Sequence, residues 1–543
     1  MSYNYFVPNN CTNHNSILSG YQLSLPINTE ILISEDEPVV MLNAVLERLN
    51  YRKLTATYSR IGRIEYSPRH LFKIMVYAYF RGIYSSREIE RACRENIHFM
   101  YLLEGRKVPD HNTISRFRKY HLSKCIEDLL NQLVEYLMEK GEISFSESAV
   151  FIDGTKIEAD ANKYSFVWKS ATEKHREKLW NTIRKEVPII QEEELLPEVE
   201  TIDMAYLKEL HSALETRKAE RGICFVSGTG SRKTPLQRSI EKVEVWIAKE
   251  ERYSKYLKMI GDGRNSFSKT DPDATFMHMK EDYMRNGQLK PGYNVNVAAV
   301  SEYVVGSYIS SDRTDVHTLI PFMEKLRKNY RVNRVVADSG YESEENYRYF
   351  EQHEQLSLFV KPLNHEILKT KKYRTDISRR ENMPYDREKD CYICAEGKRL
   401  LPVKTKTCSS PSGFQIEKTV YECKNCFGCP RKNACILSRS KVPLEERNKR
   451  LEVSKYFSEQ RERMEEKISS EEGKILRVNR SIQSEGVFAF VKEDMGFRRF
   501  LTRGIVNVAT EWTLLSIAYD LQKFYFKKKN NRLGRHLILP DSA

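Results

Sequence analysis

The sequence predicts an α/β protein in which a mixed β-sheet carries helices on its faces. A helical domain precedes this core and a Cys-rich segment interrupts it. Three observations predict this arrangement. Apolar residues recur at helical spacing from about residue 40 to 140, short β-branched and aromatic strands later alternate with helices, and seven of the 11 cysteines fall between Cys391 and Cys435. A chain of 543 residues is long enough for several domains.

The composition is that of a globular protein with an excess of basic residues. The chain has 89 Lys and Arg against 75 Asp and Glu, a formal net charge of +14. This excess favours a polyanionic partner such as nucleic acid, although a surface charged for solubility is the alternative. Residues 1–10 lack the features of a signal peptide, and no stretch approaches the roughly 20 apolar residues that span a bilayer. We therefore expect a cytoplasmic protein with no membrane partner and no disulfides.

The N-terminal helices have start signals and a strong basic charge. Ser67-Pro68 marks one helix start, residues 85–88 resemble a capping box, and Asp110 is expected to cap a third helix over 114–120. Residues 60–121 contain 13 Lys and Arg against 6 Asp and Glu. Short basic helices with tight turns are typical of a helix-turn-helix unit, and an ordinary helical bundle is the alternative. The candidate DNA contacts in the third helix are Arg116, Arg118 and Lys119.

Two aspartates stand in similar surroundings in the central part of the chain. Asp153 follows the apolar run 149–152, and Asp338 follows the apolar run 335–337. The first run is expected to end in a turn, with residues 156–159 as the returning strand. If the two strands are neighbours, the carboxylates face each other beyond the strand ends, and Mg²⁺ or Mn²⁺ would relieve their repulsion. Two solvated turn aspartates are the alternative.

The remaining elements follow from periodicity and turn signals. We expect a hairpin over 293–300 and 303–309, helices over 318–330 and 344–352, a strand over 358–360, and mostly helix from Lys441 to Lys529 with a core helix at 505–526. The expected organisation is a helical DNA-binding domain 1–140, core segments 145–162 and 266–362, a helical insertion 163–265, a basic and Cys-rich insertion 363–440, a helical end of the core 441–530, and a basic tail 531–543.

The cysteine segment has the spacing of a metal site. Two pairs with two intervening residues, and two further cysteines, carry the pattern: Cys391, Cys394, Cys423, Cys426, Cys429 and Cys435. Such spacing lets two thiolates reach one ion from a tight turn, and two pairs make a structural Zn²⁺ ribbon. The first two pairs are the favoured ligands. Cys429 and Cys435 replace one pair or form a second site with Cys408, and reduced free thiols are the alternative.

Five short motifs occur in a characteristic order. They are Phe-Ile-Asp-Gly-Thr-Lys (151–156), Ser-Lys-Thr-Asp-Pro-Asp-Ala-Thr-Phe (268–276), Lys-Pro-Gly-Tyr-Asn (290–294), Ala-Asp-Ser-Gly-Tyr (337–341) and Gln-Ser-Glu-Gly-Val-Phe (483–488). In this order, with strands before the first two acids, they resemble DDE-class transposases of bacterial insertion sequences. The branch that the chain resembles has a helical N-terminal domain and a Cys-rich insertion before the final acid. The resemblance runs from about residue 40 to 530.

This resemblance implies a ribonuclease-H-like core and a catalytic triad that holds Mg²⁺ or Mn²⁺. By matched motif, the triad is Asp153, Asp338 and Glu485, with Glu493 and Asp494 as nearby alternatives to the third acid. Two metal ions held there would activate water or a 3′-hydroxyl for attack on a phosphodiester. No cofactor beyond divalent metal and structural zinc is expected.

Related transposases also place basic residues around the glutamate. A lysine seven residues after it is matched by Lys492. Seven residues make nearly two helical turns, so Glu485 and Lys492 are expected to share a face. The arginine of the pattern falls on Ser481 and the tyrosine on Val478, with Arg480 adjacent. Lys492 and Arg480 are therefore further candidate DNA contacts.

The implied function is metal-dependent cleavage and strand transfer on double-stranded DNA, at element ends and target. A homodimer or higher oligomer on DNA, associated with a bacterial nucleoid, is the expected form. One alternative is a metal-dependent nuclease that cuts without joining. Another is a non-catalytic, zinc-dependent DNA-binding regulator derived from a transposase, and the presence of all three acids argues against it.

Overall fold

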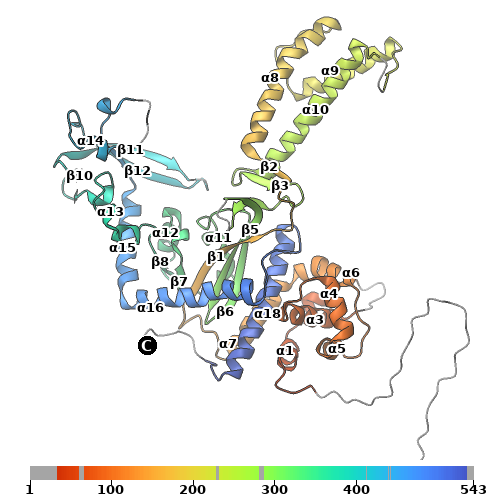
Figure 1. The fold of residues 1–543 in the computed structure, drawn as a ribbon, viewed down its shortest axis with the longest axis vertical. Coiled ribbons are helices and arrows are strands. Elements are labelled where there is room, and N and C mark those ends of the chain that lie inside the picture. Colours follow the sequence, from red (N-terminus) through yellow and green to blue (C-terminus); the bar gives the residue numbers. More distant parts are fainter. Residues whose placement is uncertain are drawn as a thin grey trace, which may run out of the picture.

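The computed structural model describes residues 33–59, 66–227, 232–279, 287–410, 412–437, 440 and 442–534. These residues form a helical N-terminal region, a central mixed sheet, a projecting helical arm and a second sheet (Figure 1). The mixed α/β class expected from the sequence is confirmed. In the part of the chain that the structure describes, no helix is long and apolar enough to cross a membrane.

The N-terminal region consists of short helices around a buried central one. They are α1 (Pro38–Leu46), α2 (Arg52–Thr55), α3 (Pro68–Phe80), α4 (Ser86–Glu95), α5 (Ile97–Leu103), α6 (His111–Arg116), η1 (Phe117–His121), η2 (Leu122–Lys124) and α7 (Ile126–Glu139). α3 begins at Pro68, as predicted. The Ser85 side chain makes no capping hydrogen bond, so the predicted capping box does not form. The Asp110 cap is confirmed, since its carboxylate accepts from the Thr113 backbone N–H at 3.1 Å.

The central sheet combines parallel and antiparallel strands in the order β4-β5-β1-β7-β8, with β6 also pairing β5. The strands are β1 (Val150–Glu158), β4 (Thr275–His278), β5 (Leu289–Val300), β6 (Tyr303–Ser310), β7 (Arg334–Ala337) and β8 (Ser357–Val360). β7 is parallel to both of its neighbours, and the other pairings are antiparallel. The predicted hairpin is β5–β6, and the other predicted strands of this block are β7 and β8.

β1 differs from its prediction, because it runs unbroken through Asp153 and Gly154 where a turn was expected. It pairs antiparallel with β5 from Phe151 to Glu158. A Cβ at Gly154 would lie 2.8 Å from a carboxylate oxygen of Asp315. The glycine therefore makes room for a neighbouring side chain and does not turn the chain, which explains why an Asp-Gly pair misled the prediction.

Helices cover the sheet and connect it to the N-terminal region. They are α11 (Leu319–Arg327), η3 (Ser339–Tyr341), α12 (Glu344–Glu351), α15 (Lys455–Ser469), α16 (Glu471–Arg480), η7 (Ser481–Glu485), α17 (Gly486–Ala489), η8 (Phe490–Asp494) and α18 (Ile505–Lys529). α18 packs on β6, α3 and α7 and is buried along most of its length, which confirms the predicted core helix (Figure 1). Its start is fixed by Asp271 and Asp273, which accept from the backbone N–H groups of Gly504 and Ile505 at 3.2 and 2.9 Å.

The helical arm leaves the core through a two-stranded ribbon. α8 (Lys169–Glu193), α9 (Met204–Glu220) and α10 (Pro235–Ile260) pack around their own apolar cluster, and β2 (Phe166–Trp168) pairs β3 (Ser266–Ser268) at the base. Figure 1 shows the arm projecting away from the central sheet and from the N-terminal helices. An arm with a core of its own agrees with the helical segment expected in this part of the sequence.

The Cys-rich segment folds as a second sheet in the order β13-β12-β11-β10-β9. Its elements are η4 (Ile367–Lys369), α13 (Lys371–Arg374), η5 (Arg380–Asn382), β9 (Tyr385–Asp386), β10 (Cys391–Ile393), β11 (Arg399–Ser409), β12 (Gln415–Glu422), α14 (Lys432–Cys435), η6 (Leu444–Glu446) and β13 (Arg450–Val453). β13 lies where helix was predicted, because it completes the sheet by pairing β12. The expected helical region therefore begins at Lys455.

Candidate active site

The first two acids of the predicted triad stand side by side at one edge of the central sheet. The parallel register of β1 and β7 ends at the pair Ile152 and Ala337. Asp153 is the next residue of β1 and Asp338 comes directly after β7, so both follow the last position at which these two strands pair. Asp153 is buried, whereas the Asp338 side chain is 44% exposed. The two strands are neighbours, which is the condition under which the two carboxylates were expected to face each other.

Glu485 comes to the same place from the C-terminal helices, and Arg480 connects all three acids. The Arg480 guanidinium lies 2.7 Å from Glu485 Oε1 and 3.9 Å from carboxylate oxygens of both Asp153 and Asp338. Its side chain is mostly buried, at 16% exposure. The protein thus gathers three carboxylates around one internal cation, and this arrangement supports Glu485 as the third acid.

A π-helical turn explains how Arg480 reaches Glu485. Five residues in an α-helix turn the chain by about 500°, which would place the two side chains on different faces. Residues 481–485 form a π-helix, in which backbone hydrogen bonds join residue i to residue i+5 and each residue turns the chain less than in an α-helix, so Arg480 and Glu485 come closer to one face. The family pattern expects the arginine four residues before the glutamate, and the π-turn absorbs the one-residue difference. This irregularity has no obvious sequence signal, so the analysis of spacing missed it.

The alternative third acids face elsewhere. Glu493 is 58% exposed and forms an ion pair with Arg498 at 2.6 Å. Asp494 is exposed at the end of η8. Lys492, by contrast, is buried, and its ammonium donates to Thr155 Oγ1 at 2.8 Å. Lys492 therefore lies against β1 two residues from Asp153, and it supports the strand that carries the acid.

A layer of polar residues beneath the acids was not anticipated. Asn294 Nδ2 donates to Asp315 Oδ1 at 2.7 Å, and the Tyr341 hydroxyl donates to Asn296 Oδ1 at 2.6 Å. Burial raises the pKa of Tyr341 well above its usual value, and the negative charges of Asp315 and the two aspartates of the triad raise it further. The phenol therefore stays neutral. The available signal was Asn294 and Asn296, two buried polar residues at alternating positions of an apolar strand.

The donor set around Arg480 fits a hard divalent cation. Carboxylate oxygens are the ligands that Mg²⁺ and Mn²⁺ prefer, and the position already accommodates positive charge. Within the described ranges, only His211, Glu215 and Glu244 place three potential ligand atoms within 4.8 Å of one another. The ligand atoms of Asp153, Asp338 and Glu485 do not lie within that spacing, so joint coordination of one ion requires the three carboxylates to draw closer.

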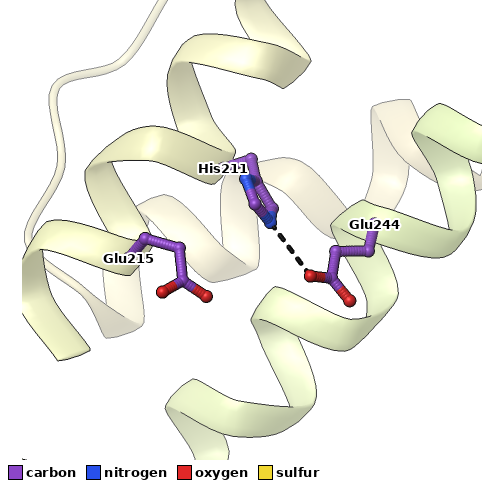
Figure 2. Close-up of side chains that lie close together, drawn as sticks. All are labelled: His211, Glu215 and Glu244. Atoms are coloured by element: carbon purple, nitrogen blue, oxygen red, sulfur yellow. Dashed lines mark hydrogen bonds and ion pairs between the residues drawn. The ribbon is translucent and has the colours of Figure 1, made fainter.

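The His211 group lies on the arm, on the facing helices α9 and α10 (Figure 2). His211 Nε2 is 3.3 Å from Glu244 Oε1, and Glu215 pairs with Lys218 at 2.8 Å. Each side chain is at least partly exposed to solvent. Because exposed pairs of this kind are common between packed helices, we interpret them as surface ion pairs.

Five of the seven clustered thiols surround one small cavity. The cavity measures about 20 Å³, which is enough for one water molecule or one ion. The cysteines that line it are Cys394, Cys423, Cys426, Cys429 and Cys435. The Lys449 backbone N–H donates to Cys426 Sγ at 3.4 Å, which orients that thiol. Cys391, from the favoured set, is buried in β10 but does not line the cavity, and neither does Cys408. Thiolate sulfur is a ligand type that Zn²⁺ prefers, but no three of these described sulfurs lie within 4.8 Å of one another, so joint coordination requires them to draw together.

The basic residues of the third N-terminal helix divide into two kinds. Arg116 and Lys119 are exposed. Arg118 is buried, and its guanidinium donates to the Tyr79 hydroxyl at 2.7 Å and to Ser86 Oγ at 3.2 Å. A buried side chain in such contacts has no access to a phosphate, so we assign Arg118 a structural role.

Comparison with known families matches two parts of the chain. The family described as a transposase DDE domain matches residues 393–525, and a transposase domain (DUF772) matches residues 27–120. The first match includes Glu485, Arg480 and all of α16, while Asp153 and Asp338 lie between the two matched segments. Neither the curated proteins nor the solved structures gave a match. A DDE transposase domain implies a ribonuclease-H-like core, in agreement with the mixed sheet.

Proposed function

Since the chain carries domains of two transposase families, which indicates a DNA transposase, we propose that it cleaves and joins DNA strands at Asp153, Asp338 and Glu485. The single observation that carries this proposal is the meeting of the three acids around Arg480, from strands and helices far apart in the sequence. Three carboxylates in one place are the ligand set that metal-dependent phosphodiester chemistry requires.

The residues of the site have separate roles in this proposal. The three acids would hold divalent metal, which would supply Lewis acidity and a more acidic bound water at this position. Arg480 neutralises the acids and turns toward the DNA phosphate, where a planar guanidinium pairs well with two oxygens. Lys492 fixes β1 through Thr155, and its burial favours positioning over a direct DNA contact.

The other two regions would position the DNA and the catalytic helix. We propose that exposed Arg116 and Lys119 contact element-end phosphates, with the protein acting as a homodimer or higher oligomer on DNA. The thiols around the small cavity would hold a structural Zn²⁺, since a site closed by protein thiolates leaves no position for water. The best-placed ligands are drawn from Cys394, Cys423, Cys426, Cys429 and Cys435.

The decisive experiment uses DNA that carries the sequences flanking the gene. Purified full-length protein is incubated with this DNA and a target plasmid in Mg²⁺ or Mn²⁺, and both cut ends and joined products are scored. Cleavage followed by joining is the expected result. Cleavage with no joining under any condition would identify a nuclease. Specific binding with no metal-dependent cleavage would identify a regulator, and either outcome overturns the proposal.

The DNA-binding role is tested by its dependence on salt. Each neutralised phosphate of duplex DNA contributes about −0.9 to the slope of log affinity against log salt. Arg116→Ala and Lys119→Ala should each make the slope shallower by about that amount while the thermal midpoint stays the same. Arg118→Ala should instead lower the thermal midpoint, because it leaves buried partners without a donor. Unchanged slopes for Arg116→Ala and Lys119→Ala would move end recognition elsewhere.

A further inference from the structure

A cavity of about 360 Å³ opens directly beside Asp338, between α16 and the end of β8. Four of its lining residues are cationic and one is acidic: Lys361, Lys474, Arg477 and Arg480 against Asp338. The acid already faces Arg480 at 3.9 Å. Three cations of the lining, Lys361, Lys474 and Arg477, remain beside this pair, and they can face an anionic ligand next to the acids.

Arg477 is the lining residue whose surroundings most favour an anionic ligand. Its side chain is partly buried, and none of the described residues makes a hydrogen bond or an ion pair with its guanidinium. A partly desolvated cation without a counter-ion is unfavourable unless an anion binds there. The other two cations have acidic neighbours, since Lys474 pairs with Glu471 at 2.8 Å and Lys361 with Glu366 at 2.9 Å.

The spacing of the cations matches a strand that passes the active site. Lys474, Arg477 and Arg480 are three residues apart on α16, and all three side chains line the cavity. Each step advances about 4.5 Å along the helix axis. This row of three cations begins at Arg480, beside the triad, and runs away from it along α16. A sugar–phosphate backbone that continues past a scissile phosphate would follow the same direction.

The cavity also has an apolar wall, formed by Phe359, Ile468 and Val478. A site for free phosphate needs no such wall, whereas a base or a deoxyribose does. The volume lies at the lower end of the roughly 300–1,000 Å³ found for small-molecule pockets. A single nucleotide is therefore a better match to the cavity than a duplex.

We propose that this cavity is a subsite for one nucleotide of the DNA strand next to the scissile phosphate, with its phosphate against Arg477 and Lys474 and its base against the apolar wall. The assignment rests on the proposed function for its place in the reaction. It adds a specific substrate contact that the triad alone does not provide.

The test measures binding of a short single strand of mixed sequence by fluorescence anisotropy, without divalent metal and over a series of salt concentrations. Arg477→Ala should weaken binding about tenfold, which corresponds to one charge-assisted contact. It should also make the salt slope shallower by about 0.7, the value for one phosphate of a single strand. Arg477→Lys should keep the slope and recover part of the affinity, because it keeps the charge and loses the planar fork.

Two further variants separate the cavity from general electrostatics. Arg463→Ala removes the same charge from an exposed position on α15, outside the cavity lining, and should bind like the parent protein. Val478→Trp should narrow the cavity and weaken binding with no change in slope. Equal losses for Arg463→Ala and Arg477→Ala, or parental binding by Arg477→Ala or Val478→Trp, would overturn the subsite.

The assay also separates this inference from the proposed function. Binding is measured without metal, so it does not depend on cleavage. A protein that never cleaves but loses affinity only through Arg477 and Val478 would refute the transposase activity and keep the subsite. A protein that cleaves and joins, with Arg477→Ala at the parental KM and salt slope, would keep the activity and refute the subsite.

Discussion

The carboxylate centre and the thiol cluster differ in how the protein balances their charge. In the carboxylate centre, Arg480 lies among three acids and supplies an internal counter-charge. The thiol cluster has no need of one, because burial raises the pKa of Cys423 to about 11, helped by the neighbouring Cys426 and Cys394. Lys449, one of the lysines that line the same cavity, directs its ammonium to backbone carbonyls.

This difference predicts two kinds of metal site. A metal that enters the carboxylate centre competes with a cation belonging to the chain, which suits a weakly held, exchangeable ion. A metal that enters the thiol cluster must displace protons from buried sulfur, and it then gains a closed set of strong ligands. We expect the first site to govern the rate of reaction and the second to govern the folding of the Cys-rich sheet.

The largest effect should come from removing a charge of the triad. Asp338→Asn should lower metal-dependent cleavage by at least about 10³-fold, because the ligand set for metal is incomplete. Circular dichroism and DNA binding should not change. Asp262→Asn, at a fully exposed position where the arm ends, is the matched control and should cut like the parent. A parental cleavage rate for Asp338→Asn would refute the proposed catalytic centre.

Substitution of a thiol should damage the fold of the Cys-rich sheet and spare the metal dependence of cleavage, the reverse of the effect expected for the triad. Purified protein should contain at least one Zn²⁺ per chain, and Cys426→Ser should lose it and expose residues 385–453 to limited proteolysis. Activity should fall, because α16 follows this insertion, but the dependence on Mg²⁺ should persist. Cys408→Ser, outside the cavity lining, should retain the metal. If metal analysis finds no zinc and all seven thiols titrate freely, the cysteines are ordinary reduced thiols.

Removal of the Arg480 side chain should have a smaller effect on the cleavage rate and should change metal binding in the opposite direction. Arg480→Ala removes the cation that competes with metal, so Mn²⁺ should bind the free protein several-fold more tightly. Cleavage should nevertheless slow by about 10²-fold, the usual cost of one lost donor to a charged transition state. Arg480→Lys should restore the weaker Mn²⁺ affinity more fully than the rate. Calorimetric titration measures the Mn²⁺ affinity of the parent and of each variant. Weaker Mn²⁺ binding by Arg480→Ala would contradict the role assigned to the charge of Arg480.

The sequence predicted the parts of this centre that rest on regular structure. Apolar runs located β1 and β7, and the motifs placed an acid directly after the last residue at which each strand pairs the other. The third acid and its arginine depend on a π-helical turn, which is decided by tertiary packing and leaves no local pattern. For the same reason the analysis could not tell buried Arg118 from its exposed neighbours, since their burial depends on contacts with α3 and α18.

The cysteine pattern shows a similar limit. The spacing pointed to a segment in which five cysteines line one cavity, since paired cysteines in tight turns can face one ion. It could not rank the pairs. Cys391 was expected as a ligand, yet it is buried in β10 away from the cavity, while Cys429 and Cys435 come to the cavity from the turn before α14 and from its end. That choice depends on how β10 meets the rest of the sheet.

The smallest expected effect concerns Gly154, the residue that the sequence placed in a turn. A Cβ there would lie 2.8 Å from an Asp315 carboxylate oxygen and 3.0 Å from the Tyr341 hydroxyl. Gly154→Ala should therefore shift the layer beneath Asp153 and lower the cleavage rate about tenfold, with a loss of roughly 1–3 kcal/mol in stability. Gly263→Ala, where a Cβ would meet nothing within 4 Å, is the matched control.

A second substitution tells whether the Gly154 effect acts through Asp315. Asp315→Ala removes the group that the new methyl would meet, so Gly154→Ala should destabilise an Asp315→Ala background much less than the parent. Contacting residues show such non-additivity, and independent ones do not. Chemical denaturation of the four proteins measures it. Additive losses would mean that the contact with Asp315 does not set the cost of a side chain at this position.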